Sequence, residues 1–195
     1  VDCTLGAGGH ALGILQASQP EGQLLGFDLD PQALALARET LAPHEQRTLL
    51  VQRSYTKLNK TRQEIQWPLV NGIVLDLGAS SMQFDTPERG FSFREDAPLD
   101  MRFSPTITES AADIINTYSE AELAEIIFRY GEERASRRIA KAIFRKRPIR
   151  TTFELATLIS TVIPRKGKRV HPATRTFQAL RIAVNDELGS IEKVL

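Results

Sequence analysis

The chain has 195 residues, of which 42% are hydrophobic and 25% charged, and its formal net charge is +1. This composition can bury a core and excludes a disordered chain, while the length favours one domain with an insertion. The single cysteine, Cys3, excludes an internal disulfide, and the sequence has neither an apolar run of membrane-spanning length nor a signal peptide at its start. We therefore expect a cytoplasmic protein without a membrane partner, and the absence of zinc-ligand spacing predicts no metal site.

Four short apolar runs in the first part of the chain predict β-strands. They cover residues 1–5, 23–29, 48–54 and 72–77. The stretches between them predict helices, notably 10–17 and 31–41. Strands that alternate with helices, and continuous apolar runs such as GIVLDL, are typical of a parallel sheet covered on both faces. We expect the α/β class with a doubly wound parallel sheet.

After residue 101 the pattern predicts helices alone. Ser119 and Glu122 have the spacing of a capping box that opens one helix, and Gly131 is expected to end it. Thr151 and Glu154 have the same spacing and open another helix.

The helix between these two carries much of a basic segment. Its apolar positions, which we expect to be buried, are Ala135, Ile139, Ala142 and Ile143. Its basic positions, which we expect to face away from the core, are Arg134, Arg137, Arg138, Lys141 and Arg145. Residues 129–181 contain fifteen lysines and arginines against three acidic residues. This imbalance is typical of nucleic-acid binding and equally of a solvated basic helix face.

The change of pattern along the chain predicts three parts. Residues 1–102 form the core that contains the sheet. Residues 103–170 form a small inserted helical domain, whose last helix is expected to end at Pro164. Residues 171–195 return to the core through a single helix over 174–195.

The first strand leads into a glycine-rich turn, DCTLGAGGH, which opens the first helix. Glycines allow a ligand to approach the backbone, and the N-terminus of a helix offers free N–H groups. The spacing Gly6-x-Gly8-Gly9, with Leu12 in the third glycine position, differs from the G-x-G-x-x-G of dinucleotide enzymes. A pyrophosphate ligand is therefore disfavoured.

Two further strand ends carry residues that suit a nucleoside. Asp28 ends the second strand, where a carboxylate can accept both ribose hydroxyls, while Asp30, placed before Pro31, is expected to cap the next helix. Tyr55 follows the third strand and either lies against an adenine ring or forms a half-buried aromatic at the rim. Ligands of such folds bind at the carboxyl ends of the strands, so these features together predict an adenosine ligand without a diphosphate. S-adenosylmethionine is such a ligand.

The chain resembles the RsmH (MraW) family of ribosomal RNA methyltransferases in five stretches that run in order along nearly its whole length. These are GAGGH, DLDP, DLGASSMQFDTPERGFSFREDAPLDMR, YGEERASRRIAKAI and HPATRTFQALRIAVNDEL. The resemblance implies a Rossmann-like, S-adenosylmethionine-dependent methyltransferase core, whose sheet lacks its last strands here. The implied substrate is the N4 amine of a cytidine near the decoding centre of small-subunit ribosomal RNA, in the assembled or assembling subunit.

The resemblance also implies a set of cofactor contacts. These are Gly8, Gly9, His10, Asp28, Tyr55, Asp76 and Gln83. The family often has phenylalanine at the position of Tyr55, which keeps the stacking ring. His10 has a second interpretation, as a cap of the first helix.

The loop after the fourth strand, LDLGASSMQFDTPERGFSF, holds the candidate catalytic residues. A cytosine amine is a poor nucleophile, so catalysis must hold its hydrogens, align its lone pair and exclude water. We expect Asp76, Ser80 and Ser81 to supply these contacts, although the loop lacks the acidic or polar, Pro-Pro, aromatic motif of many amino-methyltransferases. Phe91 or Phe93 would stack on an extruded base, or else anchor the loop in the core.

Arginines around this loop and on the last helix are candidate phosphate contacts. Together with the basic helix, the predicted RNA-binding residues are Arg89, Arg102, Arg137, Arg138, Lys141, Arg175 and Arg181. Pairing of the loop arginines with acids close in sequence, such as Glu88 or Asp100, is the structural alternative.

Two other functions remain open at this point. A non-catalytic RNA-binding ribosome assembly factor explains the basic segment. A nucleotide-dependent oxidoreductase explains the sheet and Asp28 but not the missing third glycine.

Overall fold

The protein is described by a computed structural model, which covers residues 1–163 and 170–194. The chain divides into two compact units. The first comprises Val1–Gly78 together with the residues from Leu188 onward, and the second comprises Ala79–Glu187. The division into three parts that the sequence suggests stays a prediction. No helix in the described part of the chain combines the length and the apolar character that crossing a membrane requires.

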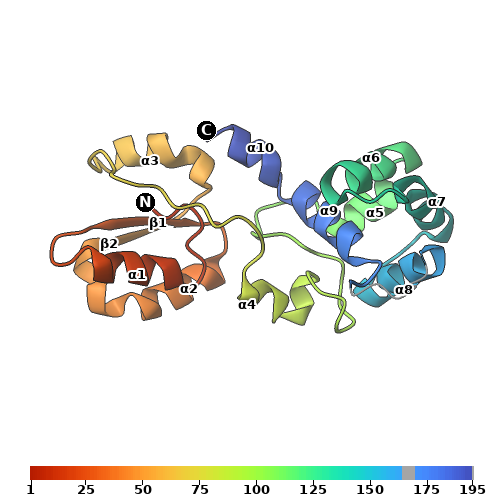
Figure 1. Cartoon of the computed structure of the whole chain (residues 1–195), viewed down its shortest axis with the longest axis horizontal. Coiled ribbons are helices and arrows are strands. Elements are labelled where there is room, and N and C mark those ends of the chain that lie inside the picture. Colours follow the sequence, from red (N-terminus) through yellow and green to blue (C-terminus); the bar gives the residue numbers. More distant parts are fainter. Residues whose placement is uncertain (164–169, 195) are drawn as a thin grey trace. The chain divides into compact units, whose positions relative to one another are not determined.

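Two parallel strands form the centre of the first unit (Figure 1). β1 (Leu24–Asp28) pairs with β2 (Thr48–Gln52) along the full length of both strands. The connection between them contains α2 (Pro31–Thr40) and a short 3-10 helix (Ala42–Arg47). This is a parallel β-α-β unit, as the second and third predicted strands require.

The predicted first and fourth strands are present as short bridged segments. Asp2 forms parallel bridges to Gly26 of β1 on one side and to Val74 on the other, so the first segment lies between β1 and the fourth. Beyond the bridge to Val74 a side chain takes the place of a backbone acceptor, because the Thr4 Oγ1 accepts the N–H of Asp76 at 2.7 Å. On the β1 side the backbone bonding continues, with the N–H of Leu5 donating to the Phe27 carbonyl at 2.9 Å. The prediction of four regular strands is therefore corrected to two strands and two bridged segments.

Side chains alternate along β1 and build an apolar cluster on each face of the sheet. Leu24 packs in a cluster with residues of α1 (Gly9–Ala17) and α2. Phe27 packs in the opposite cluster, with Leu58 at the start of α3 (Leu58–Glu64). Helices therefore cover both faces, and Figure 1 shows α1 and α2 on one side of the strands and α3 on the other. The α/β class is confirmed.

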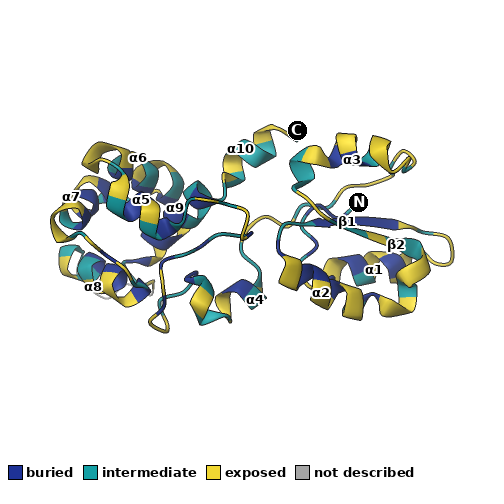
Figure 2. Ribbon diagram, turned by 180° about the vertical axis from the view of Figure 1, so that it is seen from behind, coloured by how far each residue is buried: buried dark blue, intermediate teal, exposed yellow. Residues whose placement is uncertain are grey.

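The second unit is helical in its described part. Its helices are α4 (Ser81–Phe84), α5 (Ala111–Thr117), α6 (Glu120–Gly131), α7 (Ser136–Lys146), α8 (Thr152–Val162) and α9 (Thr174–Val184), and α10 (Glu187–Glu192) begins at its last residue. The helices from α5 to α9 turn their apolar faces toward one common core, which Figure 2 marks by burial. Ile115, Ile127, Ile143 and Leu180 are fully buried there.

Both predicted capping boxes are present. The Ser119 Oγ accepts the backbone N–H of Glu122 at 3.3 Å, and the Thr151 Oγ1 accepts that of Glu154 at 3.3 Å. The glutamate side chains bond back to the cap residues, so each helix start satisfies its own free N–H groups. α6 ends at Gly131, as predicted.

The prediction of a single last helix over 174–195 is wrong, because the helix is interrupted between α9 and α10. Asn185 ends α9, and its side chain pairs with a distant loop instead of continuing the helix. Its Oδ1 accepts the N–H of Phe103 at 2.7 Å, and its Nδ2 donates to the Met101 carbonyl at 2.8 Å. Asp186 then adopts a positive φ of 45°, which turns the chain.

The basic helix α7 follows the predicted division of its faces with one correction. Ile139 and Ile143 are buried as expected, but Ser136 and Ala140 are buried in place of Ala135 and Ala142. The four buried residues have the i, i+3, i+4, i+7 spacing of one helix face, whereas Ala135 is the N-cap and Ala142 lies beside that face, and both are half-buried. The predicted end of the following helix at Pro164 lies outside the described residues.

Candidate functional site

The glycine turn of the first unit exposes its backbone to open space. Gly6 and Gly8 have positive φ values of 53° and 86°, a conformation that favours glycine. Gly8 is also the N-cap of α1, without a side-chain cap. A Cβ added at Gly6 or Gly9 would meet no atom within 4 Å, so a ligand can approach the backbone at both positions. This geometry fits a cofactor held by main-chain contacts.

Asp28 fixes this turn against the end of β1. Its Oδ2 accepts the N–H of Gly6 at 2.8 Å, and its Oδ1 accepts the N–H of Asp30 at 2.8 Å. Each carboxylate oxygen can accept a further hydrogen bond, so the group can still hold two hydroxyls. Burial raises the pKa of Asp28, and the backbone hydrogen bonds partly oppose this rise. Asp30 caps α2 as predicted, because its Oδ1 accepts the N–H of Gln32 at 3.0 Å.

His10 and Asp76 lie close together near the glycine turn. The Nδ1 of His10 is 3.8 Å from the Oδ2 of Asp76, and their side chains are 66% and 68% exposed. His10 does not cap α1, because Gly8 occupies that position. The structure therefore brings together two residues that the sequence assigned to the cofactor and leaves both open to a ligand.

Asp2 is a further candidate site residue that the sequence analysis did not single out. It is 1% exposed, and its Oδ2 has no hydrogen-bond partner within residues 1–163 and 170–194. Burial raises its pKa, and the nearby charge of His10 opposes the rise while that of Asp76 adds to it. A buried carboxylate oxygen without a partner fits a donor group of a ligand. The sequence feature that could have identified Asp2 is its position four residues before Gly6, at the start of the glycine turn.

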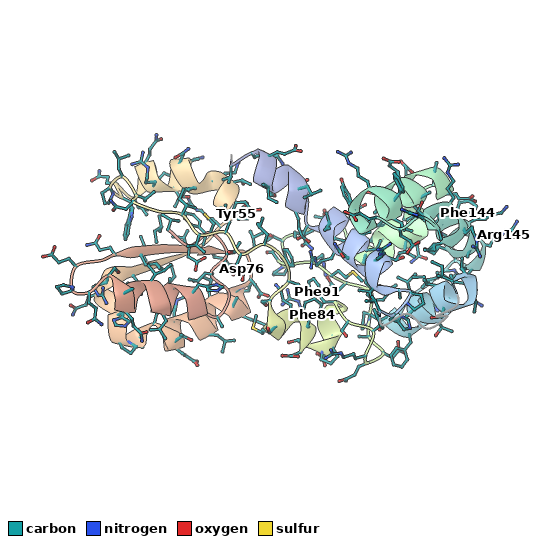
Figure 3. The ribbon with its side chains drawn as sticks, viewed as in Figure 1. Tyr55, Asp76, Phe84, Phe91, Phe144 and Arg145 are labelled. Carbon is teal, nitrogen blue, oxygen red and sulfur yellow. The ribbon has the colours of Figure 1, made fainter. Side chains whose placement is uncertain are left out.

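Tyr55 begins a short 3-10 helix (Tyr55–Lys57) soon after β2. The ring is half-buried and packs against the cluster that contains Phe27 and Leu58. Figure 3 shows Tyr55 and Asp76 at the same end of the sheet. The half-buried ring fits the rim alternative, and its contact with an adenine ring stays a prediction. The described residues contain no group of three acidic, histidine or cysteine side chains that could hold a metal ion.

Ser80, Ser81 and Gln83 belong to the second unit, where they form the start of α4. The Ser80 Oγ accepts the N–H of Gln83 at 3.3 Å, and the Gln83 Oε1 accepts the N–H of Ser80 at 3.0 Å. This capping box occupies the Ser80 Oγ and the Oε1 of the buried Gln83. Ser81 is exposed at the first position of the helix.

The two candidate stacking phenylalanines differ in environment. Phe91 is buried, with its ring centroid 5.7 Å from that of Phe103 and 6.4 Å from that of Phe84, so it anchors the loop (Figure 3). Phe93 is half-buried, and its ring centroid lies 4.6 Å from that of His171. Phe93 and His171 line a shallow hollow of about 330 Å³ together with residues of α8. The anchoring alternative is confirmed for Phe91.

Four of the predicted RNA-binding arginines bond to their own unit. Arg102 pairs with Asp100 at 2.7 Å, and Arg181 pairs with Glu187 at 2.8 Å. The Arg89 side chain donates to the carbonyl of Arg102 at 2.9 Å. The fourth, Arg175, donates to the Glu132 carbonyl at 3.0 Å. The structural alternative of ion pairing is confirmed for Arg102 with Asp100.

The remaining three predicted RNA-binding residues lie on the exposed side of α7. Arg138 donates to the Val162 carbonyl at 2.8 Å. Arg137 and Lys141 are exposed, and neither has a hydrogen bond or an ion pair to another described residue. These two cations are therefore available for an anionic partner.

A glycine turn, an acid at the end of β1 and an aromatic after β2 at one edge of a parallel sheet are typical of α/β proteins that bind nucleosides. The sequence matches the model of the MraW methylase family over residues 1–195, and the chain belongs to this family.

The chain is similar over its whole length to proteins named "Ribosomal RNA small subunit methyltransferase H". It is 55% identical to the one from Dehalococcoides mccartyi, 54% to that of Geotalea uraniireducens and 52% to that of Geobacter sulfurreducens. The chain spans 56% of the length of the first of these relatives and 64% of the other two.

Proposed function

We propose that this protein is an S-adenosylmethionine-dependent methyltransferase that modifies the N4 amine of a cytidine in small-subunit ribosomal RNA. The names of its relatives support the ribosomal RNA substrate. The observation that carries the cofactor assignment is the bond from Gly6 to Asp28, which joins the glycine turn to the acid suited to ribose. We place the target near the decoding centre, in the assembled or assembling subunit, and the reaction in the bacterial cytoplasm.

The proposed architecture is a Rossmann-like core over residues 1–102, an inserted helical domain over 103–170 and a return to the core over 171–195. The order of the four paired segments and the helices on both faces of the sheet support the core. The separate helical core of the second unit supports an inserted domain.

In this proposal each cofactor contact has a physical role. Bound S-adenosylmethionine supplies an electrophilic methyl group. Asp28 accepts the ribose hydroxyls and Tyr55 stacks on the adenine. The open backbone at Gly9, next to the buried N-cap Gly8, contacts the methionine part. The free oxygen of Asp2 suits the ammonium group. The other proposed cofactor contacts are His10, Asp76 and Gln83.

The proposed catalytic residues hold the amine. Asp76 is suited to accept an amine hydrogen and so align the nitrogen lone pair with the methyl group, because its carboxylate is exposed. Ser80 and Ser81 follow it closely, with three residues between Asp76 and Ser80 along the chain. Ser81 is the better candidate of the two, since the Ser80 hydroxyl already caps α4.

The proposed RNA contacts fall into two groups. Arg137, Arg138 and Lys141 offer exposed charges on α7 and are suited to phosphate contacts. A second group consists of Arg89, Arg102, Arg175 and Arg181. Their internal bonds keep them in place, and the charges of Arg102 and Arg181 are offset by Asp100 and Glu187, so a phosphate has to compete with these acids for the two guanidinium groups.

The test supplies labelled S-adenosylmethionine and small ribosomal subunits that lack the modification, with nucleoside mass spectrometry as the readout. The longer Geobacter sulfurreducens relative serves as the positive control. Label in N4-methylcytidine supports the proposal. Binding of subunit and cofactor without transfer, while the control reacts, would instead support an RNA-binding assembly factor. Binding of a pyridine nucleotide in place of S-adenosylmethionine would support an oxidoreductase.

A further inference from the structure

The exposed side of α7 combines charge with an aromatic ring. Its basic face, defined here as Arg137, Arg138, Lys141 and Arg145, is opposite the buried stripe of the helix. The helix contains no acidic residue that could neutralise this face. Arg145, like Arg137 and Lys141, forms no hydrogen bond or ion pair with the described part of the chain. This face is therefore a stripe of available positive charge.

Phe144 lies beside this stripe and is 49% exposed. At about 100° per residue, its side chain lies within about 60° of Arg137 and Lys141 around the helix axis. Figure 3 shows Phe144 and Arg145 at the margin of the helical unit. A base that contacts the ring would thus lie next to cations able to hold its phosphates.

The ring of Phe144 is held in place by Arg147. The guanidinium carbon of Arg147 lies 4.9 Å from the ring centroid. This guanidinium is itself fixed, because it donates to the Ile115 carbonyl at 2.6 Å and to the carbonyl of Tyr118. One ring face is therefore covered by a fixed cation, and the ring is oriented before any partner binds, which lowers the entropic cost of stacking.

We propose that Phe144 stacks on an unpaired base of an RNA strand whose phosphates bind the basic face of α7. Charge complementarity selects a polyanion, and an exposed, oriented ring beside the charges favours one with free π-faces. Paired bases in a duplex offer no such face, so the partner is single-stranded or looped RNA. The choice of RNA as the polyanion rests on the proposed function.

The test compares variants in binding a short fluorescein-labelled single-stranded RNA and its duplex form, followed by anisotropy over a range of salt concentrations. Phe144→Ala is expected to weaken single-strand binding about 5- to 150-fold, the range found for base–aromatic stacking. The salt dependence should not change, because a ring releases no counterions. Lys141→Gln should instead reduce the logarithmic salt slope by about 0.7.

Two further variants separate stacking from folding. Phe144→Trp keeps a stacking ring and should retain single-strand affinity. Phe128→Ala is the matched control, because Phe128 is 57% exposed on α6, outside the basic face, and its loss should leave affinity unchanged. The duplex should bind Phe144→Ala and the unchanged protein equally.

Three results would overturn the inference. These are unchanged single-strand affinity in Phe144→Ala, an equal loss for duplex RNA, and displacement of the RNA by polyglutamate with the same sensitivity to Phe144, which would indicate an acidic protein partner. The proposed function fails separately, if S-adenosylmethionine does not bind while the effect of Phe144 on RNA remains. Methyl transfer with no effect of Phe144 on RNA affinity would reject the inference alone.

Discussion

Replacing Asp28 with asparagine should weaken cofactor binding and also destabilise the first unit. Both oxygens of Asp28 accept a backbone N–H, from Gly6 and from Asp30, each at 2.8 Å. One further acceptor position on each oxygen is available for a ribose hydroxyl. Asparagine has one acceptor oxygen, so Asp28→Asn loses one of the two ribose bonds and the charge that strengthens the other.

The size of the effect follows from these contacts. A hydrogen bond to a charged group contributes about 1.5–3 kcal/mol, so the Kd for S-adenosylmethionine should rise about 10- to 150-fold. The amide NH₂ would also face one of the two backbone N–H groups, which should lower the free energy of unfolding by about 1–3 kcal/mol. Calorimetric titration measures the Kd, and urea unfolding measures the free energy of unfolding.

Asp30→Asn is the matched control for this change. Asparagine caps helices as well as aspartate does, so the α2 cap should survive and the cofactor affinity should not change. Unaltered cofactor affinity in a folded Asp28→Asn variant would refute the assignment of Asp28 to the ribose.

The pH dependence of cofactor binding provides a second test of the role of Asp28. Burial raises the pKa of Asp28, so its carboxylate takes up a proton at a higher pH than an ordinary aspartate. Protonation removes the charged acceptor, and cofactor affinity should start to fall at that higher pH during acidification. Because the folded pKa is above the unfolded one, ionised Asp28 opposes folding, and this cost is relieved as the pH falls through the folded pKa. In Asp28→Asn, cofactor affinity and the free energy of unfolding should both lack the pH dependence that Asp28 contributes.

Three further predictions concern catalysis and the second unit. Asp76→Ala should abolish methyl transfer while the protein stays folded, and turnover at the normal rate would remove Asp76 from the site. Gly131→Ala should cost about 1–2 kcal/mol of stability in urea unfolding, because the new Cβ would lie 2.4 Å from the carbonyl oxygen of Arg175; a stabilised variant would contradict this packing. Burial alone would raise the pKa of Asp100, but hydrogen bonds from Arg102 outweigh it and lower this pKa. The Asp100–Arg102 pair therefore stabilises the fold at pH values above the unfolded-state pKa of Asp100, and this stabilisation is lost as the pH falls through its folded-state pKa. In urea unfolding at a series of pH values, Arg102→Met should lack this loss of stability.

Features set by neighbouring residues could be predicted from the sequence. The cap at Asp30 and the capping boxes at Ser119 and Thr151 depend on contacts two or three residues away, so their spacing was enough. The exposed Arg137 and Lys141 followed from helical periodicity. A further capping box at Ser110 was missed although its spacing to an acidic residue is present.

Features set by distant contacts could not be predicted. Asn185 ends α9 because its side chain bonds to Met101 and Phe103, more than eighty residues earlier in the sequence. The ion pair of Arg181 with Glu187 depends on the turn that follows this break. Arg147 orients Phe144 only because its guanidinium donates to the carbonyls of Ile115, in α5, and of Tyr118, which follows α5.

The most direct test of the central claim is an NMR titration of the isotope-labelled chain with S-adenosylmethionine, followed through the backbone amide resonances. We predict saturable shifts at Gly6, Gly8 and Gly9, at Asp28 and at Tyr55, because their amides lie at the edge of the sheet where we place the cofactor. No shift at these positions, or shifts confined to the helices of the second unit, would contradict it.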